Sequence, residues 1–65
     1  NASIRARLAT GVCELCGKKT DEPMEVHLIP SIKTLQGEEL WKQIMRNKRR
    51  KTLVVCSDCH KTIHE

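Results

Sequence analysis

Residues 52–64 read TLVVCSDCHKTIH, and this stretch decides the fold because it joins a strand pattern to a cluster of metal-ligand side chains. Its first four residues are apolar or β-branched and favour an extended strand. Ser57 then predicts a helix N-cap, and Asp58 suits the positive end of the helix dipole. In the pattern C-x2-C-H-x3-H, His60 and His64 stand four residues apart and project from one face of that helix. The stretch therefore predicts a strand, a turn and a helix that carries metal ligands.

Two C-x2-C pairs lie thirty-nine residues apart, Cys13/Cys16 and Cys56/Cys59. Zinc sites built from two knuckles have this spacing, and two long-range disulfides are the alternative. A chain of 65 residues whose only large aromatic side chain is Trp41 can bury little core. Structural zinc contributes roughly 10–16 kcal/mol of apparent binding energy to such folds. We therefore expect zinc on four reduced cysteines, and reduced thiolates indicate an intracellular, cytoplasmic compartment.

The other elements follow from residue patterns. Residues 24–29 contain strand-forming side chains and end before Pro30, so we expect a strand that forms a hairpin with the first knuckle. Gly17 supplies the permissive backbone that this knuckle needs. Residues 38–47 predict a helix, and residues 1–11 predict a lead or linker before one zinc domain at 12–65. The helix should bury one stripe of apolar side chains, with Trp41 in the core rather than exposed for base stacking; the stripe comprises Leu40, Trp41, Ile44 and Met45.

The three histidines suggest a second metal position. His27 lies near the end of the strand at 24–29, while His60 and His64 lie on the helix after the second knuckle. If one zinc joins the knuckles, all three imidazoles converge on an open site. In the alternative interpretation, His27 is an ordinary strand residue and His64 is a solvated residue near a helix C-terminus. A third arrangement places His60 or His64 on the structural zinc in place of a cysteine.

The formal net charge is +4, and four thiolates with one zinc ion would reduce it to about +2. The distribution of charge is more informative than the total. Five positive charges in six positions suit contacts to phosphates, although a solvated helix end is the other interpretation; they are Arg46, Lys48, Arg49, Arg50 and Lys51. No signal peptide or membrane-spanning run is present in the sequence, so no membrane partner is expected.

Four segments together carry a resemblance to a known family: CELCG, EVHLI, WKQIM and RKTLVVCSDCHKTIH. Over residues 12–64 the chain resembles the HNH nuclease domain at the C-terminus of group II intron-encoded reverse transcriptases and maturases. The resemblance implies a small α+β fold, a ββα-metal, treble-clef-like finger with an extra helix. It also implies structural Zn²⁺ on the four cysteines, and cleavage of one DNA strand with Mg²⁺ or another divalent ion. The implied partners are the double-stranded intron target and, through a parent protein, intron RNA.

The resemblance assigns roles to individual residues. His27 corresponds to the first histidine of the family's V-H-H-I motif, a ligand of the catalytic metal, and His60 and His64 correspond to the histidines of the final helix. Leu28 stands where the family has its general base, and leucine cannot accept a proton. The family's central asparagine has no evident counterpart at residues 50–56. We therefore expect a nuclease domain whose cleavage is impaired.

Three functions remain compatible with the sequence. The first is an endonuclease with residual or rescued activity, in which His60, His64 or a neighbouring domain supplies the base. The second is a non-catalytic zinc module that binds nucleic acid and helps to hold a ribonucleoprotein on its target. The third is a zinc fold that contacts protein only. Loss of a general base typically costs about 10² to 10⁴ in rate without abolishing metal binding, so the first two functions share most of their structure.

Overall fold

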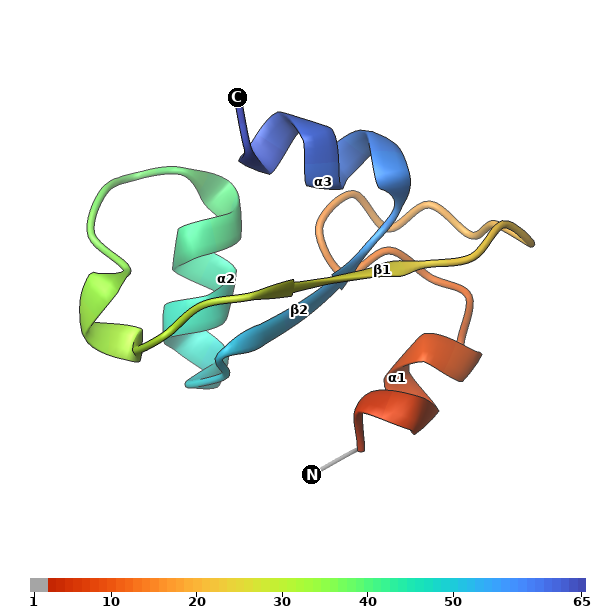
Figure 1. Cartoon of the computed structure of the whole chain (residues 1–65), viewed down its shortest axis with the longest axis horizontal. Coiled ribbons are helices and arrows are strands. Elements are labelled where there is room, and N and C mark those ends of the chain that lie inside the picture. The colour runs from red at the N-terminus through yellow and green to blue at the C-terminus, as the bar shows by residue number, and fades with distance from the viewer. Residues whose placement is uncertain (1–2) are drawn as a thin grey trace.

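A computed structural model of the chain describes residues 3–65. In Figure 1 two strands cross the centre of the molecule, with α1 and α3 on opposite sides of them. No helix within the described residues has the length and apolar character needed to cross a bilayer. The architecture confirms the expected small α+β class, with elements in the order α1 (Ile4–Ala9), β1 (Glu25–Leu28), η1 (Ile32–Thr34), α2 (Leu40–Lys48), β2 (Thr52–Val55) and α3 (Ser57–Ile63).

The two strands form an antiparallel sheet in which Glu25 lies opposite Val55 and Leu28 opposite Thr52. The strand expected at residues 52–55 is confirmed. The expected hairpin between residues 24–29 and the first knuckle is wrong, because β1 pairs with β2 from the other end of the chain. The pairing brings the segment before α3 alongside the segment that carries His27.

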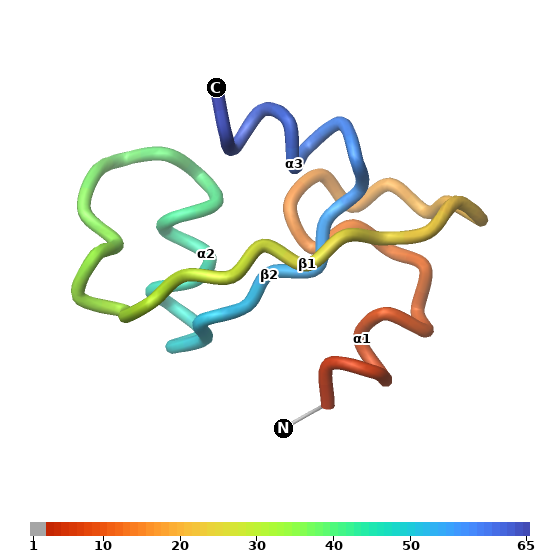
Figure 2. Tube along the Cα trace, viewed as in Figure 1, coloured from red at the N-terminus to blue at the C-terminus, as the bar shows by residue number. Residues whose placement is uncertain are grey.

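The first knuckle instead closes on itself. An isolated bridge joins Val12 to Lys19, and the N–H of Cys13 donates to the carbonyl of Lys18 at 2.9 Å. Gly17 donates its N–H to the Cys13 carbonyl at 2.9 Å and has a φ of +79°, a conformation that glycine adopts without steric cost. The knuckle therefore satisfies part of its own backbone, and the N–H of Glu14 donates to the Val54 carbonyl of β2 at 2.8 Å. Figure 2 shows this orange loop beside the start of α3.

The core lies against the sheet face that carries Leu53 and Val55. In α2, Met45 is 1% exposed, and Trp41 and Ile44 are partly buried against the core, as predicted. The prediction for Leu40 is wrong, since its side chain is 59% exposed. Leu40 is the first residue of α2 and lies about 140° around the helix from Met45, at 3.6 residues per turn. The expected helix at residues 38–47 thus begins two residues later, after Glu39 as N-cap.

Part of the expected lead at residues 1–11 is the helix α1, and residues 1–2 lie outside the described residues. Ser3 caps α1 by accepting the N–H of Ala6 at 3.1 Å. Arg7 is buried and donates to both carboxylate oxygens of Glu14, at 2.8 and 2.6 Å, and to the Thr52 carbonyl at 3.0 Å. The Glu14 carboxylate also accepts the N–H of Val54 at 2.9 Å, and this hydrogen bond offsets part of the free-energy cost of burying the charge. These contacts join α1, the knuckle and β2.

Replacing Arg7 should therefore destabilise the whole domain. Arg7→Ala leaves the Glu14 carboxylate partly buried without its guanidinium, and such a change costs on the order of 3 kcal/mol. Urea unfolding in zinc-containing buffer measures the effect. Arg5→Ala removes an equivalent charge from an exposed position of the same helix and should change stability by less than about 0.5 kcal/mol. Equal urea midpoints for the two variants would show that the Arg7 contacts contribute nothing to the fold.

Candidate metal centres

The four cysteines form one cluster. Their sulfur atoms all lie within 4.8 Å of one another, and all four are free thiols rather than disulfides. Two come from the first knuckle and two from the junction of β2 and α3. The junction differs from the prediction in one respect, because Cys56 and not Ser57 is the N-cap of α3. Cys56 occupies the extended cap position where the chain turns into α3, and Ser57 is already helical.

The charge balance of the cluster favours a bound cation. Burial alone would raise the pKa of Cys13, but N–H groups that point at its sulfur, including those of Cys16 and Leu15 at 3.4 Å, lower that pKa to about 6. Burial raises the pKa of Cys59, and the neighbouring sulfur atoms raise it further. Four thiolates this close repel one another unless a cation lies between them. Four sulfur donors on two knuckles fit a closed metal site.

The three histidines form a second, separate cluster. His27 projects from β1, while His60 and His64 stand one turn apart on α3; their ligating nitrogens lie within 4.8 Å of one another. The two Nε2 atoms of His60 and His64 are 3.0 Å apart. The ring centroid of His27 lies 5.6 Å from that of His60 and 5.1 Å from that of His64. No histidine nitrogen is grouped with the cysteines, so the arrangement with a histidine in the cysteine site is not adopted.

His27 has the properties expected of a metal ligand. Its Nε2 is buried and, among residues 3–65, is the one fully buried side-chain nitrogen or oxygen without a hydrogen-bond partner. Trp41 packs edge-on against the His27 ring, with 4.9 Å between centroids, and fixes its plane. Burial lowers the pKa of His27, and electrostatic interaction with His64 and His60 lowers it further. A neutral imidazole with an unpaired nitrogen is the form that binds a metal ion.

Leu28, which follows His27 on β1, lies on the other face of the strand. Side chains alternate along a strand, and the exposed fraction changes from 7% at His27 to 70% at Leu28. Val26 shares the outer face and is 37% exposed. Position 28 is therefore open to solvent and adjacent in sequence to His27, a candidate metal ligand.

The basic segment divides into paired and exposed side chains. Arg46 donates from Nη1 to the carbonyls of Leu35 at 2.8 Å and Gly37 at 2.9 Å, and so ties the loop before α2 to that helix. Arg50 is 29% exposed and its Nη1 lies 4.0 Å from a Glu14 oxygen. The exposed cations at the end of α2 and the start of β2 are Lys48, Arg49 and Lys51.

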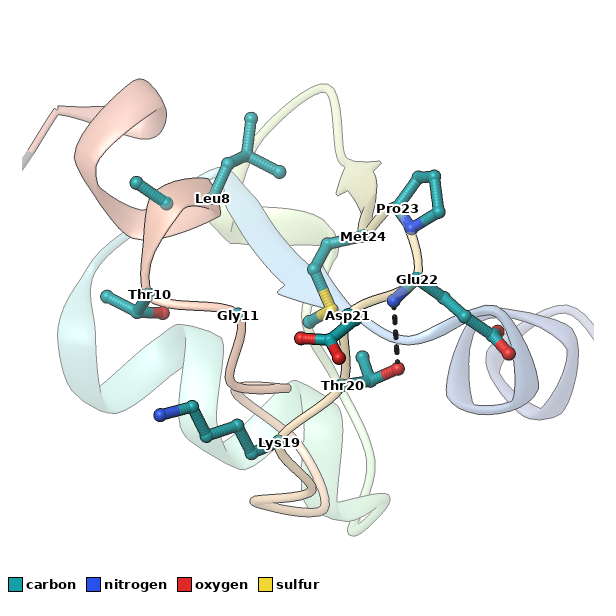
Figure 3. A pocket seen from close by; sticks show the side chains of 10 residues that line it. Leu8, Thr10, Gly11, Lys19, Thr20, Asp21, Glu22, Pro23 and Met24 are labelled. Carbon is teal, nitrogen blue, oxygen red and sulfur yellow. Dashed lines mark hydrogen bonds between the residues drawn. The ribbon is translucent and has the colours of Figure 1, made fainter.

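An open pocket lies away from both clusters, between α1 and the loop that leads into β1 (Figure 3). Leu8 and Met24 supply apolar surface, and Lys19, Asp21 and Glu22 supply charges of both signs. None of the ten lining residues belongs to either candidate metal centre.

The sequence patterns did not identify Glu25, which contacts the histidine cluster. A carboxylate oxygen of Glu25 contacts Nδ1 of His60, although the two residues are 35 positions apart in the chain. The alternation in E-V-H places Glu25 and His27 on the same face of β1 and was a usable signal for this contact.

This arrangement is that of an HNH-type endonuclease domain. Residues 13–60 match the family described as AI2M/AI1M-like, HNH endonuclease, and the chain belongs to that family, which confirms the resemblance found in the sequence. The chain is also 40% identical over 62 residues to the Group II intron-encoded protein LtrA of Lactococcus lactis subsp. cremoris, and equally to the protein of that name from strain MG1363. The alignment covers 94% of this chain and 10% of each relative, so the chain spans about a tenth of their length. No solved structure matches the chain.

Proposed function

We propose that this chain is the zinc-stabilised, DNA-binding HNH domain of an intron-encoded reverse transcriptase or maturase, and that its own cleavage activity is impaired. The observation that carries the proposal is the convergence of three imidazoles beside a separate four-cysteine cluster, with the buried Nε2 of His27 unpartnered. The likeness to proteins named as group II intron-encoded supports the parent context. Reduced cysteines suit a reducing intracellular compartment.

In this proposal the cysteine cluster holds Zn²⁺ and has a structural task. Its four ligands tie the first knuckle to the β2–α3 junction, and this fixes the direction in which α3 leaves the sheet. That direction places His60 and His64 opposite His27 on β1. The cysteine cluster therefore organises the histidine cluster.

The histidine cluster would hold a divalent ion, and three imidazole donors suit a transition-metal ion better than Mg²⁺. Such an ion would stabilise negative charge on a phosphate. Trp41 packs against the His27 ring and keeps it in place. Hydrolysis also needs a base for the attacking water, and the alkyl side chain of Leu28 cannot accept a proton. The missing base reduces the rate by about 10² to 10⁴ and leaves the binding residues intact.

A non-catalytic module that binds nucleic acid is the second candidate, and the position of Leu28 on the face of β1 opposite His27 favours it. A leucine that is 70% exposed beside a metal-ligand position contributes little to the core, so the fold does not require it there. In both candidates the exposed cations Lys48, Arg49 and Lys51 contact DNA phosphates. The proposed target is double-stranded intron DNA, and contact with intron RNA would come through the parent protein.

The salt dependence of DNA binding tests the interface. Lys48→Ala combined with Lys51→Ala should weaken duplex binding and reduce the slope of log K against log salt by about 1.8, at 0.9 per phosphate contact. Fluorescence anisotropy over a salt series measures the slope. The double variant Arg5→Ala and Lys19→Ala removes the same charge from exposed positions of α1 and the knuckle, and its slope should match that of the parent. Binding that does not respond to salt, or no binding, would favour a protein-contact module instead.

A further inference from the structure

Glu25 lies at the start of β1, two residues before His27 and on the same face of the strand. Its Oε1 contacts Nδ1 of His60, and the side chains of His60 and Glu25 are 23% and 44% exposed. On the other side of the ring, Nε2 of His60 lies 3.0 Å from Nε2 of His64. The imidazole of His60 is therefore held at both nitrogens.

These two contacts determine which nitrogen of His60 carries the proton. An ionised carboxylate only accepts hydrogen bonds, so Nδ1 of His60 must be the donor to Glu25. In the neutral ring Nε2 is then an acceptor, directed at the centre of the cluster. The contact between the two Nε2 atoms needs one donor and one acceptor, so His64 carries its proton on Nε2 when no cation is bound.

We propose that Glu25 is the positioning residue of the histidine cluster, because its carboxylate sets the tautomer and the ring orientation in which His60 presents Nε2 to a divalent cation. The inference rests on the cation site of the proposed function and adds a fourth side chain to it. A carboxylate behind a ligating histidine fixes the ring and raises its basicity, and loss of such a partner typically costs 10- to 100-fold in metal affinity.

Ring nitrogen shifts of His60 test the proposal directly. Long-range ¹H–¹⁵N spectra are recorded at about pH 8 on protein loaded with zinc at the cysteines and free of any other cation. The parent should show His60 protonated at Nδ1 and His64 at Nε2. Glu25→Ala should lose the Nδ1 preference of His60, whereas Glu25→Gln should keep much of it because the amide oxygen still accepts. Glu22→Ala, which removes an exposed carboxylate from the loop before β1, should match the parent.

Nickel titration by calorimetry gives the second readout, since imidazole ligands suit Ni²⁺. Glu25→Ala should bind 10- to 100-fold more weakly than the parent, Glu25→Gln should fall between them, and zinc content should stay constant. His60→Ala serves as the control for loss of a ligand. An unchanged His60 tautomer in Glu25→Ala overturns the role of Glu25 whether or not nickel binds. A parent with the expected tautomer but no nickel binding overturns the cation site, and with it the positioning role toward a cation.

Discussion

Cys16→Ala is expected to abolish the cooperative unfolding transition of this chain, although Cys16 is exposed. Loss of an exposed side chain removes little packing energy, and surface substitutions usually change stability by less than about 0.5 kcal/mol. A structural zinc contributes roughly 10–16 kcal/mol of apparent binding energy, which is as large as the whole stability of a small domain. Loss of the fold in this variant would therefore come from the metal and not from the core.

Thermal unfolding followed by circular dichroism, together with zinc content by mass spectrometry, measures the result. Cys56→Ala should also unfold the domain, but Cys56 is buried, so that variant mixes the loss of a ligand with the loss of packing. Lys18→Ala changes an exposed neighbour in the same knuckle and should retain both the transition and one zinc. Chelation of the parent should reproduce the behaviour of Cys16→Ala. A normal transition in Cys16→Ala would exclude the four-cysteine zinc site.

The predictions that the structure confirms rest on spacings of a few residues. The strand at residues 52–55 and the helix after it follow from a local pattern, and so does the placement of His60 and His64 one turn apart. The C-x2-C pairs likewise place two sulfurs close together within each knuckle. Assembly of the two pairs into one cluster could be predicted because a metal site is the common reason for such pairs.

The contacts that the sequence patterns did not predict join distant parts of the chain. Arg7 donates to Thr52 across 45 positions, and Glu25 contacts His60 across 35. The sequence alone also favoured a hairpin between neighbours, whereas β1 pairs with β2. Local propensity identifies strands but does not choose their partners, because pairing depends on which backbone groups other contacts have already satisfied. Here the knuckle bonds partly to itself and, through the N–H of Glu14, to the Val54 carbonyl of β2, while β1 pairs with β2.

Leu28→His is expected to raise the rate of plasmid nicking with Mg²⁺ or Mn²⁺ by about 10²-fold or more, because it puts a proton acceptor where the resemblance to the family places the general base. The outward position of residue 28 makes the variant compatible with the fold. Its side chain is 70% exposed, so histidine there creates neither a cavity nor a clash, and the thermal transition should stay where it is in the parent. The parent and variant are compared at equal zinc content on supercoiled plasmid.

Val26→His is the matched control, because residues 26 and 28 are neighbours on the outer face of β1, two positions apart in the chain. It adds the same imidazole to the same surface, and its nicking rate should stay at the level of the parent. His60→Ala in the Leu28→His background should remove the gain, since the cation site loses a ligand. A gain in both outward histidine variants would indicate non-specific base catalysis at the DNA surface rather than a restored base.

The geometry gives the remaining outcomes distinct meanings. Residue 28 faces away from His27, so a base there reaches the attacking water only if the phosphate spans the edge of β1 between the two faces. Nicking by the parent at the rate of the variant would mean that another group, such as the exposed His64, takes the proton. If neither protein nicks DNA while both are folded, zinc-loaded and bound to duplex with a steep salt dependence, the outward position of residue 28 excludes it as a base. The domain would then act through DNA binding alone.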